Sequence, residues 1–217
     1  MPQPSDELRQ ELISEISATA DHIDLAPYRF SASSGFASTF PLFTKLLANA
    51  AVWKANTRDS ELAWSWRLRS GRHMIWTGPS EPLAVPNQLC ENHQLLLSCF
   101  NGAFSTKHAP HWTFQNALGM YYVAADPLDV HTHAQLGNSD SFTLEPGSFI
   151  TFFSHWNGDY FLYDRATTQV LFATASPYPP KHGSAVPGSS ILTKPLGGVT
   201  FCQFVEQTAN ALLEALA

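Results

Sequence analysis

Charged residues are scarce in this sequence. Asp, Glu, Lys and Arg make up 14% of its 217 residues, whereas soluble domains average roughly 25%. Acidic residues outnumber basic ones by 18 to 12, which gives a formal net charge of -6. A nucleic-acid-binding domain needs a basic patch or stripe. The composition therefore predicts no nucleic-acid partner.

Long hydrophobic runs are also missing from the sequence. No apolar stretch reaches the roughly 18 to 20 residues that a membrane-spanning helix needs. Residues 1–16 are polar and acidic, unlike the charged and apolar regions of a secretory signal peptide. We therefore expect a cytoplasmic protein with no membrane partner.

Cysteine pairs and catalytic motifs are absent as well. The three cysteines, Cys90, Cys99 and Cys202, have no zinc-type spacing and are interpreted as reduced, buried thiols. The sequence contains neither of the common glycine-rich phosphate-binding loops and no nucleophile elbow. We therefore predict no cofactor, no metal and no catalytic residues, which is the pattern of a protein that is not an enzyme.

The sequence does contain a clear β-meander between Gly147 and Ser176. Its strands are expected where β-branched and aromatic residues cluster, over residues 148–154, 159–163 and 170–172. Asn157 and Gly158 tolerate the positive φ of a tight turn, and Asp164 begins a second turn. Because both faces of the runs carry apolar side chains, we expect a central meander covered on both sides.

Segments with helical periodicity surround this meander. Apolar residues recur every three or four positions in four segments, at residues 6–20, 40–53, 88–100 and 200–217. Alternating apolar residues from Glu61 to Thr77 predict a hairpin with Trp64 and Trp66 on one face. Residues 28–39 are rich in Ser, Gly and aromatics and are expected to be an irregular connection. The order of elements predicts an α+β fold with a mainly antiparallel central sheet and packed helices.

Prolines mark the best candidate boundary within the chain, at positions 79, 82 and 86. Residues 1–80 would hold the N-terminal helices and the Trp-rich hairpin. The apolar face of that hairpin needs a partner, so we expect residues 1–80 to form a layer on the same domain as residues 81–217.

A set of short motifs lies in the second part of the chain: Val85-Pro86, Phe100-Asn101-Gly102, Phe149-Ile150-Thr151-Phe152, Asn157-Gly158-Asp159-Tyr160, Asp164, Val170 and a closing helix from Phe201 to Leu216. In these motifs the chain from about Leu83 to Ala217 resembles the SMI1/KNR4 (SUKH) family. The chain departs from the family pattern at Ala103, where a second Gly is usual, and at His155-Trp156. The resemblance implies an α+β, non-catalytic, protein-binding module. Many bacterial members are immunity proteins that neutralise a toxin.

Candidate partner-binding residues follow from exposed aromatics and from the meander turns. Trp112 and Trp156 lie in or beside polar loops, where a large apolar side chain is hard to bury, and Trp is a common anchor of protein interfaces. The turn around Trp156 adds Asn157 and Asp159, and the next turn adds Asp164. These five residues are the predicted partner-binding site.

One metal-like pattern competes with this prediction. His131 and His133 are spaced so that both imidazoles would point to one side of a strand, and acidic residues lie nearby. The alternative function is therefore a small metal-dependent hydrolase. A further alternative is a chaperone-like partner of a secreted protein. The leading expectation remains a non-enzymatic module that binds a bacterial toxin domain.

Overall fold

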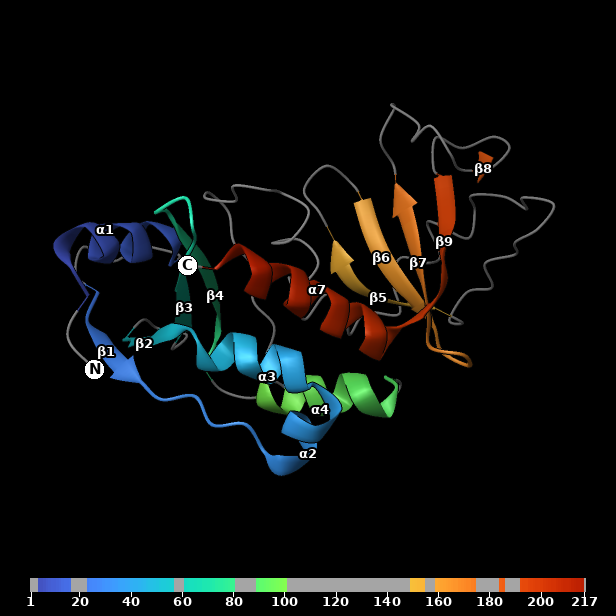
Figure 1. Cartoon of the computed structure of the whole chain (residues 1–217), viewed down its shortest axis with the longest axis horizontal. Coiled ribbons are helices and arrows are strands. Elements are labelled where there is room, and N and C mark those ends of the chain that lie inside the picture. Colours follow the sequence, from blue (N-terminus) through green and yellow to red (C-terminus); the bar gives the residue numbers. More distant parts are fainter. Residues whose placement is uncertain are drawn as a thin grey trace.

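A computed structural model describes residues 4–16, 23–56, 61–80, 89–100, 149–154, 159–174, 184–185 and 192–216. Within these ranges the α+β class is confirmed, because helices pack with two antiparallel sheets (Figure 1). None of the helices that the structure describes is both long and apolar enough to cross a membrane.

The first sheet has four strands in the order β1-β2-β3-β4. Their bounds are β1 (Leu25–Tyr28), β2 (Ala51–Ala55), β3 (Glu61–Arg67) and β4 (His73–Pro79). The hairpin predicted between Glu61 and Thr77 is confirmed as β3 and β4, with Trp64 directly opposite Trp76. Trp64 and Trp66 share one buried face, whereas Ala63 is buried on the other.

The second sheet has five strands in the order β5-β6-β7-β9-β8. Their bounds are β5 (Phe149–Ser154), β6 (Asp159–Asp164), β7 (Gln169–Thr174), β8 (Ser184–Ala185) and β9 (Leu192–Thr200). The predicted meander is confirmed as β5, β6 and β7, with β5 at the edge of the sheet. Tyr163 and Val170 join the main core, while their neighbours Leu162 and Leu171 are buried on the opposite face. The inner strands β6 and β7 are therefore covered on both faces.

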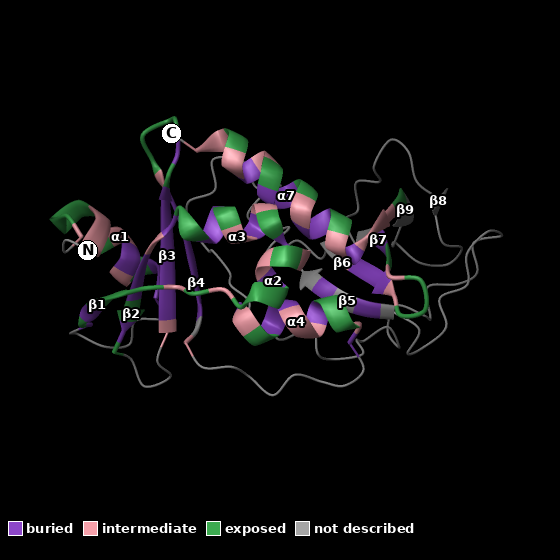
Figure 2. Cartoon of the chain, turned by 60° about the horizontal axis from the view of Figure 1, so that its bottom comes forward, coloured by how far each residue is buried: buried purple, intermediate pink, exposed green. Residues whose placement is uncertain are grey.

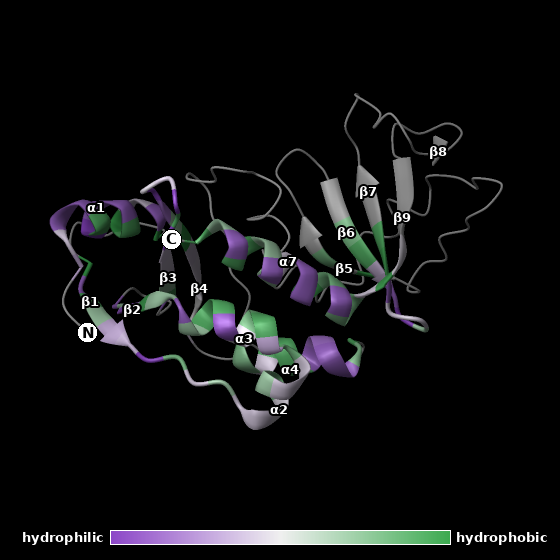
Figure 3. Ribbon diagram, in the orientation of Figure 1, coloured by the Kyte–Doolittle hydropathy of each residue, from purple (hydrophilic) through white to green (hydrophobic). Residues whose placement is uncertain are grey.

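Between the two sheets in Figure 1 lie α2 (Ser34–Thr39), α3 (Pro41–Ala48), α4 (Glu91–Cys99) and α7 (Phe201–Ala215). Thr200 and Gln203 form a capping box that begins α7 directly after β9. At its other end, Leu216 makes a β-bridge with Leu68 beside the first sheet. Helix α7 thus connects the two sheets, and Figure 3 shows hydrophobic and hydrophilic residues alternating around it.

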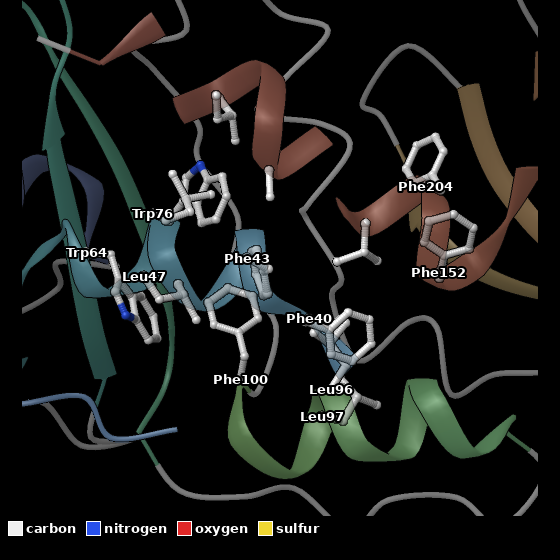
Figure 4. Close-up of a cluster of buried hydrophobic side chains, with 14 of the residues drawn as sticks. Phe40, Phe43, Leu47, Trp64, Trp76, Leu96, Leu97, Phe100, Phe152 and Phe204 are labelled. Atoms are coloured by element: carbon white, nitrogen blue, oxygen red, sulfur yellow. The ribbon is translucent and has the colours of Figure 1, made fainter. Parts of the chain in front are cut away.

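A single aromatic-rich core joins the helices to both sheets. Phe100, at the end of α4, packs against Phe43 and Trp64 with ring centroids 5.2 and 5.1 Å away (Figure 4). Towards the second sheet, Phe152 packs edge-on against Phe201 and Phe204 of α7. Residues before and after position 80 therefore share this core.

A carboxylate from α7 fixes the start of α3. The residue at the N-cap of α3, Phe40, has no side-chain group to cap the helix. Glu206 instead accepts hydrogen bonds from the backbone N–H groups of Leu42 and Phe43, both at 3.0 Å. A negative group at a helix N-terminus also interacts favourably with the partial positive charge of the helix dipole at that end. Glu206 therefore links the two helices.

Helix α1 (Asp6–Glu15) covers the outer face of the first sheet, away from the other helices. Leu12 and Ile16 are buried against Trp53 and Ile75, among others. Ser5 caps the helix as its sequence position predicts, by accepting a hydrogen bond from the N–H of Leu8.

The structure corrects the helix predicted over residues 40–53. That helix ends at Ala48, and Ala51–Ala55 forms strand β2. Val52 and Trp53 favour strands, and pairing with both β1 and β3 buries them. The sequence pattern was misleading because alanine and leucine dominate the helical part and continue up to the strand.

Two neighbouring predictions also change. Residues 28–39 were expected to be irregular, yet residues 34–39 form α2, with the Ser33 hydroxyl as its cap. The helix predicted over residues 88–100 is described from Glu91 to Cys99, with Cys90 at its N-cap. Gln88, where the predicted helix would begin, lies outside the described residues, and Leu89 and Cys90 precede the helix.

Candidate functional site

The structure describes two of the five predicted partner-binding residues. Asp159 begins β6 and Asp164 ends it, so they lie at opposite ends of one strand. Trp112, Trp156 and Asn157 lie outside the described residues. The binding role of the turn around Trp156 stays a prediction.

Asp164 holds the turn between β6 and β7. Its Oδ1 accepts hydrogen bonds from the backbone N–H groups of Ala166 at 2.7 Å and Thr167 at 3.0 Å. Thr168 completes the turn with φ of 59°. One carboxylate oxygen is thus occupied by the local backbone.

The metal alternative involves residues that the structure does not describe, since His131 and His133 fall in the range 101–148. Among the described residues, no group of three or more His, Cys, Asp or Glu side chains is placed to hold a metal ion. The hydrolase alternative therefore stays a prediction from sequence alone.

A buried polar cluster joins α4, β6 and α7. His93 is fully buried, and its Nδ1 lies 3.1 Å from the phenol oxygen of Tyr163. That oxygen also accepts a hydrogen bond from the backbone N–H of Cys90. The His93 ring packs against that of Phe201 with ring centroids 4.8 Å apart, and its Nε2 has no hydrogen-bond partner among the described residues.

Burial makes this cluster unsuited to acid–base chemistry. Burial lowers the pKa of His93 from 6.5 to about 3, because a desolvated imidazolium is unfavourable. Burial, followed by the neighbouring Cys90 thiol, raises the pKa of Tyr163 well above its usual value. A general acid or base needs a pKa near the working pH and access to substrate. We interpret the cluster as part of the packing.

The three cysteines are free and half-buried. Burial, with contributions from Glu206 and Cys90, raises the pKa of Cys202, which favours the less reactive thiol form. Cys99 lies beside two hydroxyl groups, with its Sγ 3.5 Å from Ser33 Oγ and 3.7 Å from Ser98 Oγ. Cys99 also lines a cavity.

An exposed segment, residues 28–33, borders two cavities in the described part of the chain, and we call it the strap. It runs from β1 to α2 and crosses over β3 and β4 in Figure 2. Phe30 and Ala32 anchor it by packing against the main core. Tyr28 and Arg29 are exposed, and Tyr28 is 36% exposed, high for a large apolar side chain.

Two grooves adjoin the strap. The α4 groove has a volume of about 420 Å³, and its walls beyond the strap are Leu62, Trp64, Ser80, Ser98 and Cys99. The α3 groove has a volume of about 550 Å³, and its walls beyond the strap are Pro27, Leu47, Ala48, Ala50 and Val52. Tyr28, Arg29 and Phe30 line both grooves. A mainly apolar hollow with a few polar groups is the usual form of a recognition site.

The sequence analysis did not select Tyr28 or Arg29. The residues that follow, Ser31-Ala32-Ser33-Ser34-Gly35, are small, but this pattern does not show that Tyr28 and Arg29 are exposed. Whether such side chains are exposed depends on long-range packing, which sequence periodicity does not report in an irregular segment.

In comparisons with known proteins, no family model, no curated protein and no solved structure matches the chain.

Proposed function

We propose that this chain is a non-enzymatic protein-binding module that neutralises a bacterial toxin by binding it directly. The observation that supports this function is the strap, where Tyr28 and Arg29 are exposed between two grooves. The resemblance to the SMI1/KNR4 family supports the same class of function and suggests the immunity role.

The chemistry of the strap suits a protein interface. Tyr and Arg are enriched among the residues that dominate binding energy, because they combine apolar area with directional hydrogen bonds. The surface is also poor in charge, with 14% charged residues in the whole chain. Interface cores are likewise depleted of charged groups.

Co-expression with a neighbouring gene product tests this function. Where a toxin-like protein is encoded beside this gene, we expect the chain to restore growth of cells that express that protein, because a direct complex would block the toxin. Growth on induction of the toxin is measured with the chain, with an empty vector and with the chain plus an unrelated toxin. Growth arrest that persists although both proteins are soluble would refute the proposed function.

A further inference from the structure

We propose that the strap and its two grooves bind an extended acidic segment of the partner protein. This inference rests on the proposed function and adds the chemistry of the partner. Three features of the strap support it: its charge, the shape of its surroundings and the adjoining edge of β1.

Charge complementarity favours an acidic ligand. Arg29 is the one charged side chain among the described residues that line the two grooves. The recognition surface is therefore locally positive, although the whole chain carries a net charge of -6. A carboxylate of the partner can form a two-point hydrogen-bonded pair with a guanidinium group, whereas a basic segment would be repelled.

The shape of the surface favours an extended segment over a small molecule. The two grooves have different walls beyond the strap and share Tyr28, Arg29 and Phe30 as a common ridge. A segment that crosses this ridge can place one side chain in each groove. Beyond the strap, the apolar walls are core side chains that are less than 8% exposed, Leu62 and Trp64 in the α4 groove and Ala50 and Val52 in the α3 groove. The accessible contact area is therefore supplied mainly by the strap itself.

The edge of the first sheet excludes the commonest alternative for an extended peptide. A partner strand could pair with β1, the edge strand, through backbone hydrogen bonds. Pro27 lies inside β1, opposite Trp53, and proline has no N–H to donate. The β1 edge is thereby blunted. We therefore assign recognition to side chains of the strap and not to strand addition.

A displayed library of random peptides can test this proposal without knowledge of the partner. Peptides of roughly 12 residues would span about 40 Å when extended, enough to cross the strap. The purified full chain is the bait, and selected peptides are synthesised and measured by fluorescence polarisation. We expect selection for Asp or Glu next to apolar residues and weaker binding at high salt.

Point variants connect the peptides to the strap. Arg29→Glu and Tyr28→Ala should each weaken binding about tenfold. Arg72→Glu is the matched control, because it makes the same charge change at an exposed position in the turn between β3 and β4. Its effect should be no more than about twofold, since exposed charges at a distance are screened. Far-UV circular dichroism confirms that each variant is folded.

Three results would overturn the proposal: no enriched peptide, enriched peptides without acidic residues, or acidic peptides that bind the folded Arg29→Glu variant as tightly as wild type. The outcome is separable from that of the proposed function. If the chain rescues growth and Arg29→Glu rescues equally, toxin binding stands and the strap is not its site. If wild type fails to rescue but acidic peptides still require Arg29, the strap site stands and the immunity role does not.

Discussion

Between pH 7 and pH 4, the unfolding free energy of the wild-type protein should fall by about 3 kcal/mol more than that of a His93→Phe variant. His93 is fully buried beside Tyr163 and Phe201, and its pKa falls from 6.5 to about 3 on folding. Phenylalanine can keep the ring packing but cannot take up a proton. Urea unfolding followed by tryptophan fluorescence at pH 7, 5 and 4 measures the difference.

The sign follows from which state binds the proton. Between pH 6.5 and about 3, His93 is protonated in the unfolded chain and neutral in the folded one. The unfolded state therefore binds more protons, and stability falls as the pH is lowered through this window. Above pH 6.5 both states are neutral, so the residue contributes no pH dependence there.

The comparison between variants isolates His93 from the carboxylates, which also titrate in acid. His93→Phe loses the contact with Tyr163 at every pH, so it is expected to be less stable than wild type by about 1 kcal/mol at pH 7. The stability gap should close and then reverse as the pH falls. Parallel pH profiles for the two proteins would show that His93 is not buried as a neutral group.

Replacing Phe100 with alanine should destabilise the protein by about 3 to 5 kcal/mol. Phe100 is fully buried and its ring packs against Phe43, Trp64 and Trp76. Truncation would leave a cavity where α3, α4 and the first sheet meet (Figure 4). Urea unfolding at pH 7 measures the loss, and thermal unfolding provides a second measurement.

Two control variants show how large the effect of the Phe100→Ala substitution is. Phe100→Leu keeps most of the buried volume, so its unfolding free energy should be lower than that of wild type by less than about 1.5 kcal/mol. Ser98→Ala changes an exposed residue on the same helix, whose hydroxyl bonds the local carbonyl of Leu95, and should stay within about 0.5 kcal/mol. An alanine variant as stable as the Ser98→Ala control would contradict the packing around Phe100.

Local signals were sufficient to predict much of the fold. The meander was readable because a glycine turn and an aspartate turn separate runs of strand-forming residues, and β5, β6 and β7 follow those runs. The hairpin of β3 and β4 was readable from strict alternation around Trp64 and Trp66. The last helix carried a clear apolar stripe, and the structure adds that Thr200, at the start of the predicted range, is its N-cap.

Elements defined by long-range pairing were not predictable in the same way. Strand β2 depends on β1 and β3 for its hydrogen bonds, and its short sequence reads equally well as the end of a helix. Strand β9 contains Pro195, Gly197 and Gly198, which normally interrupt strands. It forms because β7 pairs with it through a bulge between Gln169 and Leu171. The division of the strands into two sheets also depends on such pairing.

The candidate site shows the same limit. The sequence directed attention to tryptophans and to turn residues, of which Asp164 supports its own turn. Tyr28 and Arg29 stand out only when the packing of Phe30 and Ala32 fixes the strap over the sheet. Exposure between two grooves is a property of the folded chain, so it had no counterpart in periodicity or composition.

Hydrogen–deuterium exchange of the full chain, with and without a toxin whose growth arrest the chain relieves, tests the central claim most directly. The account predicts that binding slows amide exchange in residues 28–33, and that this protection is lost in Arg29→Glu but kept in Arg72→Glu. A complex that forms with unchanged exchange in residues 28–33, and with protection confined to the turn at residues 155–159, would contradict it.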